Sequence, residues 1–212
     1  MDLGNMRSNY ERAELHRRDL ESDPIRQFTK WFGEACDSKL VEPNAVSLAT
    51  SDSQGRPLLR TVLVKQFDSR GFVFFTNLES RKARHIESNP HVCLLFPWIA
   101  LERQVIVCGQ ASRVSTSEAL AYFIQRPLDS QIGAWASKQS SVISSRKALE
   151  MQWQQIKQKF SDGKIPLPSF WGGFRVQPST IEFWQGRSSR LHDRFLYTKL
   201  GEDSWTLERL CP

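Results

Sequence analysis

The chain has 212 residues, 40% of them hydrophobic and 25% charged, which is typical of an ordinary soluble globular protein. A compact chain of this length buries roughly 70% of its unfolded surface, so it needs neither disulfides nor a metal for stability. The polar residues 1–23 exclude a signal peptide, and the longest apolar run, at 92–101, is too short for a bilayer; we therefore expect a cytoplasmic protein without membrane contact. The net charge of +6 suits either nucleic acid or small phosphorylated ligands.

The first half of the chain reads as one helix followed by strands. Residues 23–36 open with Asp-Pro and carry apolar side chains at helical spacing. The runs AVSLAT (45–50), LLRTVLVKQF (58–67) and GFVFFT (71–76) are rich in strand-forming residues and are separated by turn sequences. These patterns predict a helix and then three short strands.

The segment NLESRKARHIESNP (77–90) predicts a short helix that Ser80 caps and that ends before Pro90. Arg81 and Lys82 occupy its first turn, where the helix dipole disfavours cations by about 0.3–1 kcal/mol each. Either this is a solvated basic turn, or an anion binds at the helix N-terminus and both side chains converge on it.

The second half continues the mixture of strands and helices. Strands are expected at 91–96 and 104–114, and helices at 117–127 and 144–160. The remaining predicted strands are FRVQP, TIEFW, RLHDRFLY and WTLERL. Many short strands with a few inserted helices predict an α+β fold built on an antiparallel barrel.

Several catalytic and metal-binding patterns are absent from the sequence. It contains no GxGxxG, P-loop, HExxH or GxSxG motif, so any phosphate must be held by side chains and a helix end. Its four cysteines, at 36, 93, 108 and 211, form no Cys-x-x-Cys pair, which argues against a zinc site and a disulfide framework. We interpret them as small buried side chains or idle thiols and expect no metal.

Two further stretches concentrate cations beside apolar residues. In RTVLVK, Arg60 and Lys65 are five positions apart and face opposite sides of a strand unless a bulge intervenes. The stretch FWQGRSSRLHDR (183–194) holds three arginines and one histidine beside two aromatics. It is either a solvated hairpin edge or the binding surface for a planar anion. If 190–194 is a strand, Arg190, His192 and Arg194 share one face.

In these and other motifs the chain resembles the FMN-dependent pyridoxine/pyridoxamine 5′-phosphate oxidases. The resemblance runs from about residue 7 to the C-terminus. The motifs are RTVLVK, GFVFFTN, SRKA, LLFPW, LERQV, RPLDSQIGAWASKQS, FWGGFRV, IEFWQG, RLHDR and the closing RLCP. It implies an FMN-binding split β-barrel, antiparallel and Greek-key-like, with flanking helices. It further implies a mobile N-terminal arm (1–20) and a single domain (21–212) whose C-terminal region serves dimerisation and substrate binding.

The resemblance also assigns residues to ligands. The implied FMN contacts are Arg60, Thr61, Val62, Leu63, Val64, Lys65, Phe75, Thr76, Arg81, Lys82, Gln104, Gln139, Ser140, Trp184 and Arg194. The implied substrate contacts are Arg7, Tyr10, Lys65, Tyr122, Arg126, Ser130, Arg190, Leu191 and His192, with Arg190 and His192 as the catalytic pair. Family members often carry tyrosine at the position of Phe75, and Glu42 stands where relatives can carry aspartate. Glu42 is either a contact to an active-site water or a local cap.

The implied reaction oxidises pyridoxamine or pyridoxine 5′-phosphate to pyridoxal 5′-phosphate. Hydride passes from C4′ to FMN, dioxygen reoxidises the flavin to give hydrogen peroxide, and the amine substrate also yields ammonia. The implied assembly is a homodimer with FMN at its interface. The alternatives are a non-catalytic split-barrel FMN-binding protein or a flavin reductase, which would not need the five residues Tyr122, Arg126, Ser130, Arg190 and His192 together. A nucleic-acid module is disfavoured because the aromatics alternate along strands as core residues do.

Overall fold

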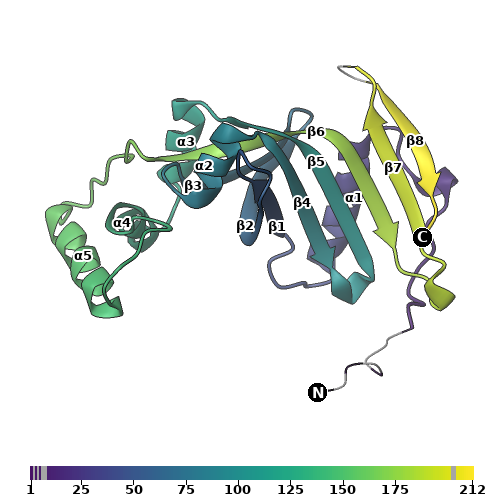
Figure 1. Cartoon of the computed structure of the whole chain (residues 1–212), viewed down its shortest axis with the longest axis horizontal. Helices are drawn as coiled ribbons and strands as arrows, with labels where there is room; N and C mark the ends of the chain where they lie inside the picture. Colours follow the sequence, from purple (N-terminus) through teal and green to yellow (C-terminus); the bar gives the residue numbers. More distant parts are fainter. Residues whose placement is uncertain (2, 4, 6–8, 202–203) are drawn as a thin grey trace.

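The strands and helices of the computed structural model follow the predicted order, with one additional α-helix and with two predicted strands joined into one (Figure 1). The structure describes residues 1, 3, 5, 9–201 and 204–212. The strands are β1 (Ala45–Ser51), β2 (Pro57–Asp68), β3 (Gly71–Asn77), β4 (His91–Trp98), β5 (Arg103–Arg113), β6 (Trp171–Gln185), β7 (Asp193–Lys199) and β8 (Trp205–Leu210). The helices are α1 (Pro24–Asp37), α2 (Arg81–Ser88), α3 (Thr116–Phe123), α4 (Leu128–Ala136) and α5 (Arg146–Lys159), with 3-10 turns η1 (Arg17–Asp19), η2 (Ile99–Leu101) and η3 (Ser188–Arg190).

Six of the strands close into an antiparallel barrel. The sheet order is β3-β2-β1-β4-β5-β6-β7-β8, and an additional pairing joins β3 to β6. The placement of β4 beside β1, after the β1-β2-β3 meander, is the Greek-key arrangement. Strands β7 and β8 extend the sheet beyond the barrel (Figure 1). The predicted α+β split-barrel fold is confirmed.

Strand β6 joins the barrel to this extension. Its first half pairs with β3 (Asn77↔Trp171 to Phe72↔Val176), and its second half pairs with β7. The sequence predicted two separate strands here, but the structure has one strand of 15 residues that contains Pro178. A bulge at Ser179 accommodates it, since Cys108 pairs with Thr180 and Gly109 pairs with Pro178. Proline is tolerated in a sheet at such bulges.

The helical part around Pro127 also differs from the prediction. The helix expected over 117–127 ends at Phe123, and Pro127 is the N-cap of α4, which the sequence analysis did not anticipate. Helices α4 and α5 project from the barrel at the left of Figure 1. A second small core, which includes Phe123, Ile132 and Trp171, packs them against the start of β6.

The predicted strand RLHDRFLY is shorter than expected. Strand β7 begins only at Asp193, and Arg190 lies in η3. Ser189 (φ 56°) and Arg190 (φ 62°) both have left-handed backbone, which ends the extended conformation before His192. The prediction that residues 190, 192 and 194 share one strand face is therefore wrong.

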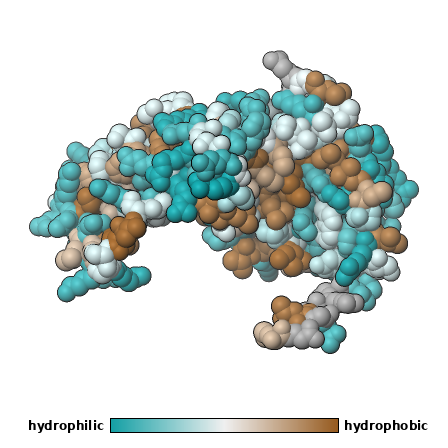
Figure 2. Space-filling view, viewed as in Figure 1, coloured by the Kyte–Doolittle hydropathy of each residue, from teal (hydrophilic) through white to brown (hydrophobic). Residues whose placement is uncertain are grey.

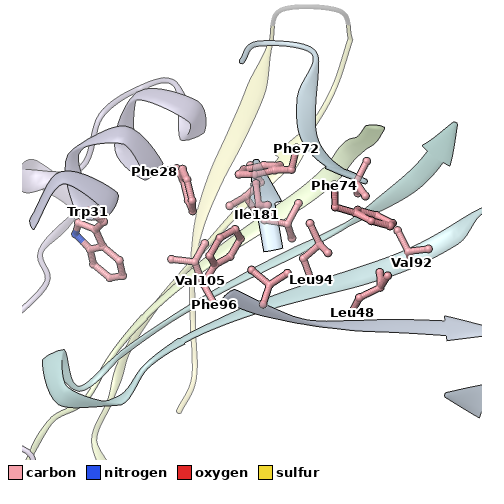
Figure 3. Close-up of a cluster of buried hydrophobic side chains, with 14 of the residues drawn as sticks. Phe28, Trp31, Leu48, Phe72, Phe74, Val92, Leu94, Phe96, Val105 and Ile181 are labelled. Carbon is pink, nitrogen blue, oxygen red and sulfur yellow. The ribbon is translucent and has the colours of Figure 1, made fainter. Parts of the chain in front are cut away.

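The main core fills the barrel and the space beneath α1. Phe28 and Trp31 from α1 point toward the aromatic and aliphatic side chains of the strands, among them Phe72 and Phe96 (Figure 3). Asp23 caps α1 by accepting hydrogen bonds from the amides of Ile25 (2.7 Å) and Arg26 (2.9 Å).

Part of the predicted N-terminal arm packs on the domain. Leu15 is buried with the main core, and its amide donates to Asp193 Oδ2 at 3.1 Å. The mobility predicted for residues 1–20 stays a prediction, and this packing confines it to residues before Leu15. No helix of the described residues is long and apolar enough to cross a membrane.

Candidate functional site

A hollow of about 650 Å³ lies between the barrel and the α3–α4 region. Figure 2 shows the molecule hollowed between the part that carries α4 and α5 and the barrel. The volume of the hollow falls within the range of small-molecule binding sites. Thirteen of the predicted site residues line it: Arg60, Thr61, Val62, Leu63, Lys65, Phe75, Thr76, Lys82, Tyr122, Arg126, Ser130, Gln139 and Ser140.

Lys82 is a buried cation at one wall of this hollow. Lys82 is 8% exposed, and its Nζ donates to Gln139 Oε1 (3.0 Å) and Thr76 Oγ1 (3.1 Å). Burial, and after it the charge of Arg60, lowers the pKa of Lys82 to about 8. Since its partners within the described chain are neutral oxygens, the ammonium is left uncompensated, which suits an anionic ligand.

Two arginines in the hollow carry unpaired donors. Arg60 donates Nη1 to the carbonyl of Leu48 at 2.9 Å, but its buried Nη2 has no hydrogen-bond partner among the described residues. Arg126 has the same deficit at Nη1. Burial lowers the pKa of both guanidinium groups. Buried donors without partners are uncommon in folded proteins, so both nitrogens mark places for ligand oxygens.

An aromatic stack forms another wall of the hollow. The rings of Phe75 and Tyr122 are 4.1 Å apart and nearly parallel, and Trp171 lies parallel to Phe75 at 5.5 Å. The Arg126 guanidinium sits 5.0 Å from the centre of the Trp171 ring. Burial raises the pKa of Tyr122, which keeps its hydroxyl a donor at neutral pH. This wall combines flat apolar surfaces with cationic and hydroxyl donors.

A bulge explains how both ends of RTVLVK reach the hollow. Val64 pairs with Phe74 and Gln66 pairs with Val73, so Lys65 is the extra residue of β2. The bulge breaks the strict alternation of the strand, and Arg60 and Lys65 both line the hollow. Val64 is buried in the core instead and does not line it.

The first turn of α2 separates the two cations that the sequence placed together. Lys82 points into the hollow, whereas Arg81 is exposed and acts on the site through its charge beside Arg60. Ser80 is the N-cap residue but makes no side-chain capping bond. The helix end therefore keeps amide donors free next to Lys82.

A second group of predicted residues gathers on the β5–β6–β7 sheet. Gln104, Trp184 and Arg194 are direct cross-strand neighbours. Arg194 is held by both oxygens of Glu182, at 2.7 and 3.1 Å, and its Nη1 donates to the carbonyl of Cys211. The Glu182 carboxylate raises the pKa of Arg194, so this guanidinium is a fixed cation.

His192 belongs to this second group, and its environment selects a tautomer. The backbone amide of Arg187 donates to His192 Nδ1 at 3.1 Å. In the neutral ring the proton then sits on Nε2, which can donate to a ligand. Trp184 (4.6 Å) and Tyr10 (5.9 Å) flank the imidazole. A Cβ at Gly186 would lie 2.8 Å from the Tyr10 ring, so glycine is required there.

The remaining predicted residues of this group lie at the surface. Arg190 and Leu191 are exposed beside the left-handed turn at Ser189. Strained backbone of this kind occurs often at functional sites. Arg7 lies outside the described residues. Glu42 is exposed and has left-handed backbone (φ 48°).

One chain does not bring the two groups together. Nine of the described residues predicted for the site lie outside the hollow: Tyr10, Val64, Arg81, Gln104, Trp184, Arg190, Leu191, His192 and Arg194. In Figure 1, β3 and α4 stand to the left of β2, whereas β7 stands toward the right end of the molecule.

Sequence reasoning missed five residues that line the hollow. They are Asn77, Gly133, Ala134, Ser137 and Trp171. Three of them lie in or just after α4, so the failure to predict this helix hid them. Among the described residues, no group of three or more His, Cys, Asp or Glu is placed to hold a metal ion.

Two family models match the chain. The model described as pyridoxamine 5′-phosphate oxidase matches residues 32–160, and the model described as the pyridoxine 5′-phosphate oxidase C-terminal dimerisation region matches residues 171–212. The second match covers β6, β7 and β8, with Trp184 on β6, Arg194 on β7 and His192 just before β7.

Individual proteins are similar over the whole chain. The pyridoxine/pyridoxamine 5′-phosphate oxidase of Rippkaea orientalis is 58% identical over 212 residues, covering 100% of both chains, and that of Cronobacter sakazakii is 55% identical, covering 99% and 96%. The structure of PhzG from Burkholderia lata, in complex with tetrahydrophenazine-1-carboxylic acid, superposes with a TM-score of 0.87 at 31% identity, covering 93% of this chain and 98% of that one. A pyridoxamine 5′-phosphate oxidase-related, FMN-binding protein of Nostoc punctiforme shares the fold, with a TM-score of 0.69 at 18% identity, covering 91% and 100%.

Proposed function

This chain belongs to the pyridoxine/pyridoxamine 5′-phosphate oxidase family, and we propose that the hollow and the β5–β7 group together form its active site. The enzyme is an FMN-dependent oxidoreductase that converts pyridoxine or pyridoxamine 5′-phosphate to pyridoxal 5′-phosphate. The proposal concerns which residues hold the cofactor, which hold the substrate, and where the two chains of the dimer meet.

The donors in the hollow fit a flavin mononucleotide. Arg60, with its unpaired Nη2, and Lys82, with no counter-ion among the described residues, would hold the phosphate together with the free amides of α2. Residues 61–65 of β2 would border the ring system, and Gln139 and Ser140 would close over it. When bound, FMN supplies the two-electron chemistry that oxidises the C4′ carbon and passes the electrons to dioxygen with release of hydrogen peroxide.

The substrate phosphate would bind at the α3–α4 end of the hollow. Arg126 offers its unpaired Nη1, and Tyr122 and Ser130 add hydroxyl donors. Each charge-assisted hydrogen bond contributes about 1.5–3 kcal/mol. Lys65, on the bulge of β2, lines the same hollow and would contact both ligands.

The second group would complete the site from a partner chain. Gln104, Trp184 and Arg194 would contact the flavin, and Arg190 and His192 would cover the vitamin ring. With Nδ1 accepting from the Arg187 amide, His192 can donate from Nε2 to the substituent at C4′ and so orient it, while Arg190 would press the ring toward the flavin. The dimerisation region matched at residues 171–212 carries these residues except Gln104, which favours a homodimer with shared sites. The cytoplasmic location and dioxygen as acceptor stay predictions.

The observation that carries the proposal is the set of uncompensated cations in the hollow: the buried Lys82 and the half-buried Arg60 and Arg126, each with one buried nitrogen that has no partner among the described residues. The test is the visible spectrum of the purified protein, followed by peroxide measurement on adding pyridoxamine 5′-phosphate. We expect a yellow protein that releases FMN on denaturation and peroxide equimolar with the aldehyde formed. A colourless protein that does not bind added FMN would overturn the assignment of the hollow.

A further inference from the structure

Cys93 and Cys108 form a pair on the outer face of the barrel. They are direct cross-strand neighbours on β4 and β5. Their sequence neighbours Val92, Leu94 and Val107 are buried in the core, so both thiols point to the outer face. Each cysteine is half-buried and free.

The hydrogen-bond pattern of the two strands sets how close these side chains lie. The amide of Ala111 donates to the carbonyl of Pro90 at 2.9 Å, and these residues face each other in the same register. Hydrogen-bonded and non-hydrogen-bonded pairs alternate along an antiparallel ladder. Pro90 and Ala111 form a hydrogen-bonded pair, and Cys93 and Cys108 lie three positions further along the ladder. An odd number of steps makes Cys93 and Cys108 a non-hydrogen-bonded pair.

Non-hydrogen-bonded pairs are the closer kind in a sheet. Their Cα atoms are about 4.5 Å apart and their side chains approach most closely. A disulfide requires Cα atoms between about 4.4 and 6.8 Å. The backbone of β4 and β5 thus already holds the two thiols within bridging range.

The surroundings favour the thiolate of Cys108. A hydrogen bond from Cys93, and a further one from Thr180 on β6, lower the pKa of Cys108 to about 6 against the effects of burial and of Glu182. The pKa of Cys93 is raised by the same thiol pair and by burial. The two thiols therefore share one acidic proton, and the hydrogen bond from Thr180 favours Cys108 as the sulfur that loses it first.

We propose that Cys93 and Cys108 are a site of reversible oxidation, at which hydrogen peroxide converts the two thiols to an intrachain disulfide. The Cys108 thiolate attacks one peroxide oxygen, the O–O bond breaks, and water leaves after protonation, giving a sulfenic acid. The Cys93 sulfur then attacks the Cys108 sulfur, and a second water leaves. The two sulfurs are each oxidised by one electron, and one peroxide is reduced to two waters.

The pair shares the outer face of the sheet with residues assigned to the cofactor, since Glu182, which holds Arg194, also acts on Cys108 through its charge. Gln104 lies on the same face of β5, four residues from Cys108, or about 13 Å along the strand. The peroxide that the proposed reaction releases is one source of oxidant, but the chemistry of the pair does not depend on it.

The experiment uses the C36S/C211S variant, in which only the pair remains. The folded protein is treated with hydrogen peroxide, alkylated, and analysed by intact mass and non-reducing peptide mapping. We expect a mass lower by about two hydrogen atoms, a Cys93–Cys108 cross-linked peptide, and full reversal by a dithiol reductant. In a C36S/C211S/C93S variant, a sulfenic-acid trap such as dimedone is expected to label Cys108.

Two results would overturn the proposal. One is oxidation of Cys108 to sulfinic acid without any intrachain bridge while Cys93 is present. The other is a bridge that forms only in urea-unfolded protein, because the register of β4 and β5 would then play no part. Equal labelling of Cys93 in a C36S/C211S/C108S variant would overturn the assignment of Cys108 as the attacking sulfur.

Discussion

At the scale of single residues, Lys82 shows how a binding site is kept ready for an anion. Burial holds its ammonium among neutral oxygens and lowers its pKa to about 8. The fall of the pKa from 10.5 to about 8 corresponds to roughly 3 kcal/mol of stability that the free protein loses while Lys82 is charged. The phosphate of a bound ligand would remove this penalty. The buried charge of Lys82 therefore lowers the stability of the apoprotein and strengthens the binding of an anionic ligand.

Replacing Lys82 by methionine separates the two effects. The Thr76–Gln139 hydrogen bond at 3.0 Å remains in the variant, so no new unpaired group is created. We expect Lys82→Met to stabilise the apoprotein by about 1–3 kcal/mol at pH 7 and to weaken FMN binding by about 10–100-fold. Urea unfolding and FMN titration measure these quantities.

The pH dependence of Lys82 has a defined sign. The unfolded lysine binds its proton up to about pH 10.5, whereas the folded one loses it near pH 8. Between pH 8 and 10.5 the unfolded state binds more protons than the folded state, so the contribution of Lys82 to the free energy of unfolding rises with pH. We expect the free energy of unfolding of the wild-type apoprotein to increase relative to that of Lys82→Met as the pH is raised from 8 to 10. A constant difference over this range would show that Lys82 is not desolvated.

Arg126 and Arg190 are predicted to affect different kinetic constants. A phosphate grip acts equally in the ground and transition states, so Arg126→Ala is expected to raise KM by about 10–100-fold with little change in kcat. Arg190→Ala is expected to lower kcat while FMN stays bound. Arg146→Ala, which removes an exposed arginine of α5, is the control and should leave both constants unchanged. An unchanged KM for Arg126→Ala would contradict the phosphate grip.

The charged residues were predictable at this scale, but their directions were not. The misplaced cations Arg81 and Lys82 indicated an anion site, and only the fold shows that Lys82 faces the hollow while Arg81 stays exposed. The unpaired nitrogens of Arg60 and Arg126 also cannot be predicted from the sequence. They depend on which hydrogen-bond acceptors the folded chain brings within reach of each guanidinium.

At the scale of elements, hydrophobic periodicity located the barrel strands well. Strands β1, β2 and β3 lie within two residues of their predicted bounds, because alternation and turn residues agree there. Predictions failed where backbone conformation overrides side-chain pattern. The left-handed Ser189 and Arg190 break a β-like run, and Pro127 ends one helical segment while beginning α4.

Strand β6 spans the barrel and its extension, and the bulge in its pairing with β5 makes Gly109 a sensitive position. A Cβ there would lie 2.0 Å from the carbonyl oxygen of Gln177, a backbone atom that cannot move without disturbing the pairing. We expect Gly109→Ala to destabilise the fold by about 2–4 kcal/mol in urea unfolding. Gly33→Ala in α1 is the control, because its Cβ meets nothing within 4 Å. Helix propensity predicts that it stabilises by about 0.5–1 kcal/mol.

At the scale of the whole molecule, the two groups of site residues lie apart on one chain. The hollow supplies phosphate donors and an aromatic wall, whereas the β5–β7 face supplies Trp184, His192 and Arg194. A two-fold dimer can place the face of one chain over the hollow of the other and form two equal sites. The motifs themselves carry no information on which copy completes which site; only the resemblance to the family implied that FMN lies at the dimer interface.

Heterodimers of differently tagged variants test the shared site. A dimer of one Arg126→Ala chain and one His192→Ala chain would contain one intact site and one site with both defects. We expect kcat/KM per dimer to be about half that of the wild type, far above either variant homodimer. If each chain held a complete site, every site would carry one defect, and activity would equal the mean of the two homodimers. The mirrored control pairs a wild-type chain with an Arg126→Ala/His192→Ala chain. In a shared-site dimer each site then carries one defect and activity is low, so a half-active control dimer would rule out the proposed arrangement.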